Sequence, residues 1–192
     1  MLLTMRRVPG KSGPGHLRFR DHGRQYRLYR SHGKAAVKVI GMRAEALERL
    51  EVFVGEWVLE ARFPGAEPVL ARTWFEWALD RQFLVQRTEN PVAEAPDGLM
   101  IVSTDPQTGA YTQHYYDSRG VVRLYAMTLA AGTWTLTRES ADFTPLDFGQ
   151  RYTGTFSADL NAITGGWEMR LPDADWAPDF VLNYRRATSA DS

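Results

Sequence analysis

Arginine and tyrosine side chains alternate with apolar ones in the middle of the sequence. Arg123, Tyr125 and Met127 are two residues apart in a β-rich stretch, so they would project from one face of a strand. A guanidinium and a phenol can both donate hydrogen bonds to a carboxylate, sulfonate or phosphate. This spacing indicates a site for an anionic group.

Two predicted hairpin turns bring further side chains to this face. With two-residue loops at Ser118-Arg119 and Ala131-Gly132, partners across each hairpin keep a constant sum of residue numbers. The predicted inward face is Thr112, His114, Tyr116, Val121, Arg123, Tyr125, Met127, Leu129, Trp134, Leu136 and Arg138. The predicted ligand-binding residues within it are His114, Tyr116, Arg123, Tyr125, Met127, Trp134 and Arg138. The opposite face is rich in threonine, which suits a solvated outer wall.

This inward face is too polar for a dry core, because buried cations need partners. We expect a cavity that binds a small hydrophobic or amphipathic molecule, anionic in character, with Arg123 and Arg138 as its charge anchors. The alternative is that both arginines pair with inward carboxylates, such as Glu76 or Glu168, and only tie strands together.

His114 is the candidate catalytic residue of an alternative hypothesis. In the predicted register it faces Arg123, so it could act as the general base of an isomerase or cyclase, with the arginine stabilising an oxyanion. A lone histidine on a strand is more often a hydrogen-bonded wall residue. We therefore expect a binding protein rather than an enzyme.

The sequence offers few residues for metal binding and none for thiol chemistry. The chain has no cysteine, which excludes disulfides, thiolate metal sites and a cysteine nucleophile. Asp173, Asp175 and Asp179 cluster around Trp176, and Pro172 and Pro178 mark this segment as a loop, where acids are usually solvated. We predict no metal site.

The candidate residues lie on predicted strands. One helical patch at 43–54 is followed by β-rich runs of about 6 to 10 residues separated by turn residues. The predicted strands are 55–62, 70–78, 82–90, 98–104, 110–117, 120–129, 133–140, 150–158, 162–171 and 179–187. So many sequential strands avoid exposed edges by closing. The predicted fold is all-β, a ten-stranded antiparallel up-and-down β-barrel with a short N-terminal helix.

The formal net charge of zero hides two different compositions. Residues 1–41 carry ten basic side chains and one acid, whereas residues 42–192 contain no lysine and have a net charge of −9. We predict a poorly ordered leader at 1–41 and a barrel domain at 42–192. Translation starting at Met42 would explain the leader; alternatively it is a basic arm for nucleic acid or anionic lipid.

No stretch of this sequence has the length and apolarity of a membrane span, and no secretory signal follows the basic N-terminus. These absences predict a cytoplasmic protein. A homodimer is left open.

The segment Phe53-Val54-Gly55-Glu56-Trp57 resembles the opening of calycin barrels, the lipocalins, fatty-acid-binding proteins and nitrobindins. Residues 53–186 are also similar to an uncharacterised bacterial group of such barrels. The stretches that carry this second likeness are 77–84, 116–121, 150–152, 166–168 and 176–185. The resemblance implies a closed barrel with Trp57 plugging one end.

Two better-known calycins allow a test of ligand type. Nitrobindin-like barrels bind haem through a histidine on a late strand, but residues 182–186 contain none. Haem is therefore disfavoured, although His114 or a tyrosine could ligate iron. Fatty-acid-binding proteins hold a carboxylate with an inward Arg-x-Tyr pair, and Arg123-Leu124-Tyr125 has that spacing on an earlier strand.

Overall fold

A computed structural model describes residues 17–21, 24–28, 43–93 and 95–191 of the chain. The chain divides into two units, residues 1–38 and 39–192. In the first unit, β1 (Leu17–Asp21) and β2 (Arg24–Leu28) pair antiparallel, which is more regular structure than the sequence predicted there. Met42, the predicted translation start, lies outside the described residues, and the domain boundary drawn there stays a prediction.

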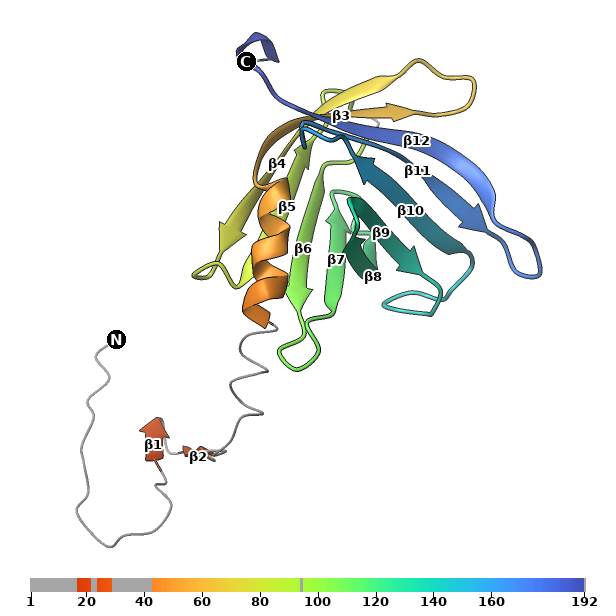
Figure 1. The fold of residues 1–192 in the computed structure, drawn as a ribbon. Coiled ribbons are helices and arrows are strands. Elements are labelled where there is room, and N and C mark those ends of the chain that lie inside the picture. The colour runs from red at the N-terminus through yellow and green to blue at the C-terminus, as the bar shows by residue number, and fades with distance from the viewer. Residues whose placement is uncertain (1–16, 22–23, 29–42, 94, 192) are drawn as a thin grey trace, which may run out of the picture. The chain divides into compact units, whose positions relative to one another are not determined.

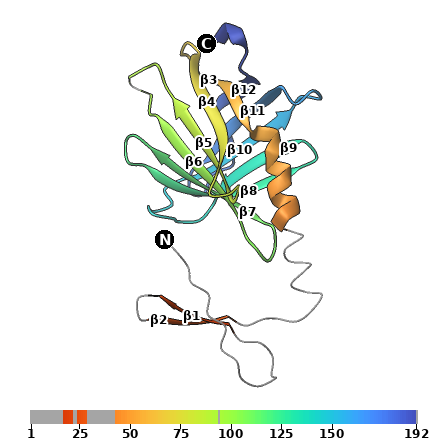
Figure 2. The same cartoon turned by 90° about the vertical axis from the view of Figure 1, so that its left-hand side faces the viewer.

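Ten antiparallel strands form a closed barrel in the second unit (Figures 1 and 2). The strands are β3 (Gly55–Arg62), β4 (Val69–Ala78), β5 (Phe83–Glu89), β6 (Gly98–Thr104), β7 (Tyr111–Asp117), β8 (Val122–Ala130), β9 (Thr133–Arg138), β10 (Gly149–Phe156), β11 (Ala162–Arg170) and β12 (Ala177–Arg186). Each strand pairs with the next in sequence, and β12 pairs with β3 to complete the circle. The predicted fold class is confirmed, with every strand end within two residues of its predicted position.

A short helix covers the end of the barrel where β3, β7 and β9 begin. Residues 43–49 are α-helical and continue into the 3-10 turn η1 (Leu50–Phe53). The buried Phe53 ring lies 5.3 Å from Phe75, 5.0 Å from Trp134 and 5.2 Å from Phe156, measured between ring centroids. These aromatic contacts fill this end of the barrel with side chains. A second 3-10 turn, η2 (Ser189–Asp191), follows β12.

Trp57 and Arg186 fasten the helix to the place where the barrel closes. The Trp57 indole N–H donates to the carbonyl oxygen of Phe53 at 2.7 Å. The Arg186 guanidinium lies 4.0 Å above the Trp57 ring and donates to the carbonyls of Val52 at 2.7 Å and Val54 at 2.5 Å. Because Arg186 ends β12 and Trp57 lies in β3, this cluster joins the first and last barrel strands to the plug.

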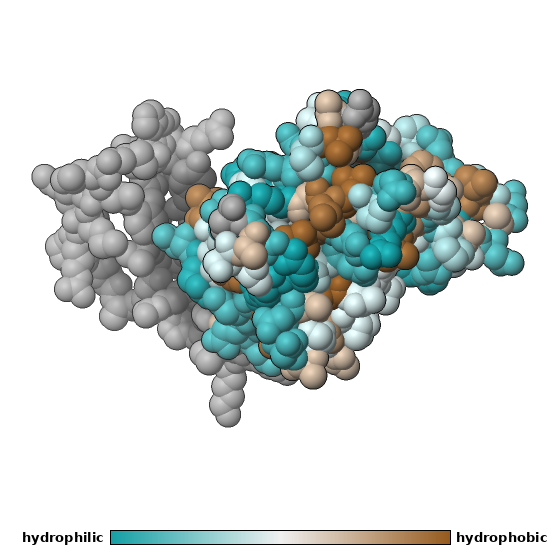
Figure 3. Space-filling model, turned by 90° about the horizontal axis from the view of Figure 1, so that it is seen from above, coloured by the Kyte–Doolittle hydropathy of each residue, from teal (hydrophilic) through white to brown (hydrophobic). Residues whose placement is uncertain are grey.

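The outer wall is largely polar. Thr133, Thr135 and Thr137 lie half-buried on the outside of β9, where they alternate with the buried Trp134, Leu136 and Arg138. Seen from above, the described surface is mostly hydrophilic, with apolar side chains gathered mainly in the middle of the view (Figure 3). Within the described part of the chain, no helix is long and apolar enough to cross a membrane.

The contacts between Arg186 and Trp57 require a glycine at position 55, and an alanine variant tests this requirement. The φ of Gly55 is +119°, and a Cβ atom there would lie 2.9 Å from a guanidinium nitrogen of Arg186. We expect Gly55→Ala to lower the free energy of unfolding by about 2–3 kcal/mol, through backbone strain and displacement of the arginine. Urea unfolding measures this loss.

Gly65→Ala is the matched control, because Gly65 also has a positive φ but open space around its Cα. Backbone strain alone should cost this variant about 1 kcal/mol. Equal losses in the two alanine variants would show that the Arg186 contact does not depend on Gly55.

Candidate ligand-binding site

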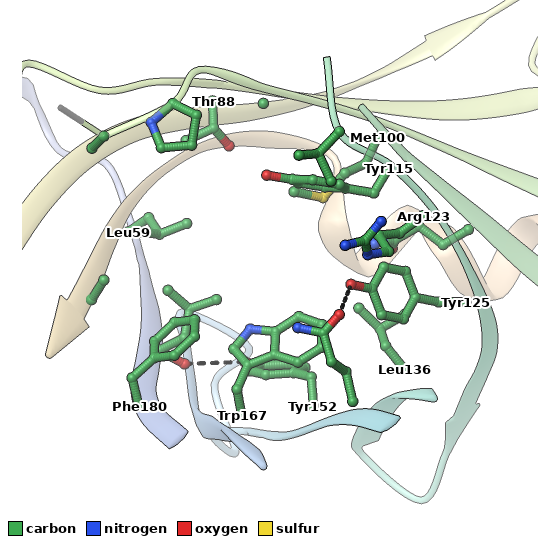
Figure 4. A pocket seen from close by; sticks show the side chains of 18 of the residues that line it. Leu59, Thr88, Met100, Tyr115, Arg123, Tyr125, Leu136, Tyr152, Trp167 and Phe180 are labelled. Carbon is green, nitrogen blue, oxygen red and sulfur yellow. Dashed lines mark hydrogen bonds between the residues drawn. The ribbon is translucent and has the colours of Figure 1, made fainter. Parts of the chain in front are cut away.

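A cavity of about 610 Å³ occupies the end of the barrel opposite the helix. Its walls are inward side chains of the strands (Figure 4). Residues of the loops that follow β3, β5, β7 and β9 also line it and form its mouth. The described lining residues are Leu59, Ala61, Phe63, Val69, Thr88, Asn90, Ala95, Pro96, Gly98, Met100, Gln113, Tyr115, Arg119, Val121, Arg123, Tyr125, Trp134, Leu136, Phe148, Gln150, Tyr152, Trp167, Phe180, Leu182 and Tyr184. None of these is acidic, and two are arginines.

Of the two arginines that line this cavity, Arg123 is the one without a carboxylate partner among the described residues. Its Nη1 donates to the carbonyl of Val122 at 3.1 Å and to the Thr144 hydroxyl at 3.0 Å. Its Nε and Nη2 have no described protein acceptor, and the side chain reaches the open space beside Tyr125 (Figure 4). By contrast, Arg119 is paired with Asp117 at 2.7 Å. Arg123 therefore has donors left for an anion.

Two tyrosines supply neutral hydroxyls next to Arg123. The Tyr125 hydroxyl donates to Gln150 Oε1 at 2.9 Å, and the Tyr115 hydroxyl donates to Asp117 Oδ2 at 3.0 Å. Burial raises the pKa of Tyr125 well above its ordinary value, and burial together with the Asp117 charge does the same for the pKa of Tyr115. Both phenols therefore stay protonated and cannot neutralise the arginine.

Arg138 points inward but serves the structure rather than the cavity. The residue is only 2% exposed, and its guanidinium binds Asp142 through two contacts of 2.7 and 3.0 Å. It also donates to the carbonyls of Phe148 and Pro145. The guanidinium holds the pKa of the Asp142 carboxyl well below its usual range. The predicted alternative, a structural pair, holds for Arg138, but its partner is Asp142 rather than Glu76 or Glu168.

The predicted register of β7 is wrong by one residue. Tyr115 pairs with Arg123 and Gln113 with Tyr125, because the loop after β7 has three residues, Ser118 to Gly120. Gly120 has a positive φ and donates its N–H to the Asp117 carbonyl at 2.9 Å, while the Asp117 N–H donates to the Val121 carbonyl at 3.1 Å. This is the arrangement of a type I turn followed by a bulge. Tyr111, Gln113 and Tyr115 therefore face inward.

His114 and Tyr116 consequently lie on the outer face of β7, as a correction to the predicted site. His114 pairs with Ile101 and Leu124, away from the cavity. It cannot act on a ligand there together with Arg123, so the catalytic hypothesis loses its geometric basis. The β8–β9 register is confirmed, with Leu129 opposite Trp134.

Three of the seven predicted site residues line the cavity: Arg123, Tyr125 and Trp134. Met127 faces inward but belongs to the buried core below the cavity. Sequence reasoning missed Tyr115, Gln150, Trp167 and Phe180. Reading Gly120 as part of the loop would have found Tyr115. Gln150 pairs with Arg138 across β9 and β10, so it needed the register of that pair, whereas Trp167 and Phe180 come from late strands brought close by barrel closure.

No histidine lines the described cavity, and His114 faces outward. Among the described residues, no three histidine, aspartate or glutamate side chains converge as metal ligands.

No protein-family model and no curated protein sequence matches the chain. The barrel is similar to the crystal structure of Rv2717c from M. tuberculosis, with 15% sequence identity and a TM-score of 0.50. That match covers 74% of this chain and 98% of Rv2717c. The likeness supports the closed-barrel fold, an architecture compatible with ligand binding.

Replacing Arg138 tests the buried pair. We expect Arg138→Met to lower the free energy of unfolding by about 3–5 kcal/mol, because Asp142 would keep a buried charge without its cation. Adding Asp142→Leu should recover much of that loss. Arg49→Met is the control, since the Arg49–Glu45 pair is exposed and its removal should cost less than about 1 kcal/mol. An equal cost for both arginine variants would contradict this assignment.

The same pair predicts a pH dependence. A carboxyl whose folded pKa is lowered contributes stability above its unfolded pKa of about 3.9 and loses it as the pH falls toward the folded value. The difference in unfolding free energy between wild type and Arg138→Met should therefore shrink when the pH falls from 7 to 2.5. Denaturant unfolding at several pH values measures this difference. A constant difference would show that the pair does not control the Asp142 proton.

Proposed function

We propose that this protein binds a small amphipathic molecule with one anionic group in the barrel cavity, and that Arg123 holds that group. The proposal rests on one observation, the incomplete hydrogen bonding of the Arg123 guanidinium. It lines the cavity with two nitrogens lacking a described acceptor, in a lining that contains no described acid. A partly desolvated cation of this kind is stabilised by an anion with hydrogen-bond acceptors.

The apolar part of the ligand follows from the remaining walls. Leucines, Met100 and aromatic rings make up most of the lining, and the volume falls within the 300–1,000 Å³ that is typical of small-molecule sites. Removal of apolar ligand surface from water then supplies the larger share of the binding free energy. The anionic group, held by Arg123, then fixes the orientation of the ligand.

The resemblance to calycins supports a carrier or sensor role rather than catalysis. Arg123 and Tyr125 have the Arg-x-Tyr spacing with which fatty-acid-binding proteins hold a carboxylate, and both face the cavity. The Tyr125 hydroxyl, already bound to Gln150, lies beside the arginine as a second polar group (Figure 4).

Two dyes that differ only in charge test the proposal. 1-Anilinonaphthalene-8-sulfonate carries a sulfonate, and N-phenyl-1-naphthylamine is the same ring system without it. Arg123→Met should weaken binding of the sulfonate about 10- to 100-fold, the value of a charge-assisted hydrogen bond, and leave the neutral dye unchanged. Fluorescence titration measures both affinities.

His114→Ala is the control on the opposite face of the sheet, and it should change neither affinity. An unchanged sulfonate affinity in Arg123→Met would refute the assignment of Arg123 as the anion site.

A further inference from the structure

Aromatic rings dominate the apolar lining of the cavity. Nine of its described lining residues carry an aromatic ring, more than the leucine, valine and methionine residues together. A barrel that only needed to enclose an alkyl chain could do so with aliphatic side chains. The arrangement of the rings is therefore informative about the ligand.

Four of these rings form a continuous surface that we call the aromatic row: Phe63, Phe180, Trp167 and Tyr125. The centroid distances are 4.6 Å from Phe63 to Phe180, 6.4 Å from Phe180 to Trp167 and 5.4 Å from Trp167 to Tyr125. The first two pairs are close to parallel, with interplanar angles of 27° and 25°. The Trp167–Tyr125 pair is tilted by 59°, so the row places four neighbouring aromatic rings of mixed orientation along one wall.

The aromatic row leads from solvent to the anion site. Phe63, in the loop after β3, is 44% exposed at the mouth, whereas Tyr125 lies next to Arg123. Trp167 pairs directly with Phe180 across β11 and β12, just before the β-bulge between Trp167 and Glu168. Such a bulge turns the strand locally and re-aims its side chains.

The wall across the cavity leaves room for a flat body. Thr88 and Met100 face Trp167 and Phe180 across open space (Figure 4). Gly98, which lies between them in the lining, adds no side chain. A planar aromatic molecule between these walls gains stacked or edge-to-face ring contacts, while a flexible alkyl chain gains none and loses more conformational freedom on binding.

We propose that the ligand is a planar, fused-ring aromatic anion rather than an alkyl one, stacked on the aromatic row with its charge at Arg123. This inference rests on the proposed function, because Arg123 sets the position of the charged end. The inference adds the chemical class of the apolar part of the ligand.

Two sulfonates with different bodies test the inference by isothermal titration calorimetry. Pyrene-1-sulfonate should bind more tightly than dodecane-1-sulfonate. Trp167→Leu should weaken pyrene-1-sulfonate about 3- to 10-fold, as expected for the loss of a ring contact, and change dodecane-1-sulfonate less than twofold. Trp167→Phe, which keeps a ring, should restore most of the pyrene affinity.

Phe63→Leu is a second variant that does not endanger folding, because this side chain is partly exposed at the mouth. It should also weaken the pyrene compound selectively. Phe143→Leu is the matched control, since Phe143 is 67% exposed and does not line the cavity. It should alter neither affinity.

Equal affinities for the two sulfonates, or an equal loss of both in Trp167→Leu, would overturn the planar class. The proposed function would still stand in that case if Arg123→Met weakened both sulfonates. No binding of either sulfonate to the wild type would overturn both proposals.

Discussion

A closed barrel of ten strands has a lumen that its own side chains fill only in part. Eight strands already give an interior just wide enough for side chains to fill, and each added strand widens it. In this protein the helix supplies the missing volume at one end. Phe53 enters between Phe75, Trp134 and Phe156, and Trp57 locks the chain that carries it. Among the described residues no comparable element enters the other end, where the cavity lies.

The two inward arginines, Arg138 and Arg123, differ in whether the nearby sequence supplies a carboxylate partner. Arg138 ends β9, and Asp142 follows four residues later in the loop, close enough to fold back onto it. The same carboxylate accepts the backbone N–H groups of Leu124 and Thr144, so this pair fixes the loop that carries Phe148 into the mouth. Arg123 has no such described partner and keeps donors for a ligand.

The strands were predictable because their alternation is strong, and the β8–β9 face was predictable because Ala131-Gly132 is a true two-residue turn with both φ angles positive. The β7–β8 turn was not, since Gly120 adds one residue to the loop. A slip of one residue exchanges the faces of a strand, which moved His114 out and Tyr115 in. Trp167 and Phe180 were beyond local patterns, because only closure of the barrel brings late strands beside Tyr125.

The charge distribution adds a constraint on what enters the cavity. Residues 42–192 carry a net charge of −9, whereas the described lining contains two arginines and no acid. A small inorganic anion would approach an acidic barrel segment and lose its hydration at the mouth, with only Arg123 to offset both costs. A molecule with a large apolar body gains burial along the walls before its charge reaches the guanidinium. Under the proposed function, the acidic charge of residues 42–192 and the arginine inside the cavity would together favour amphipathic anions over simple ones.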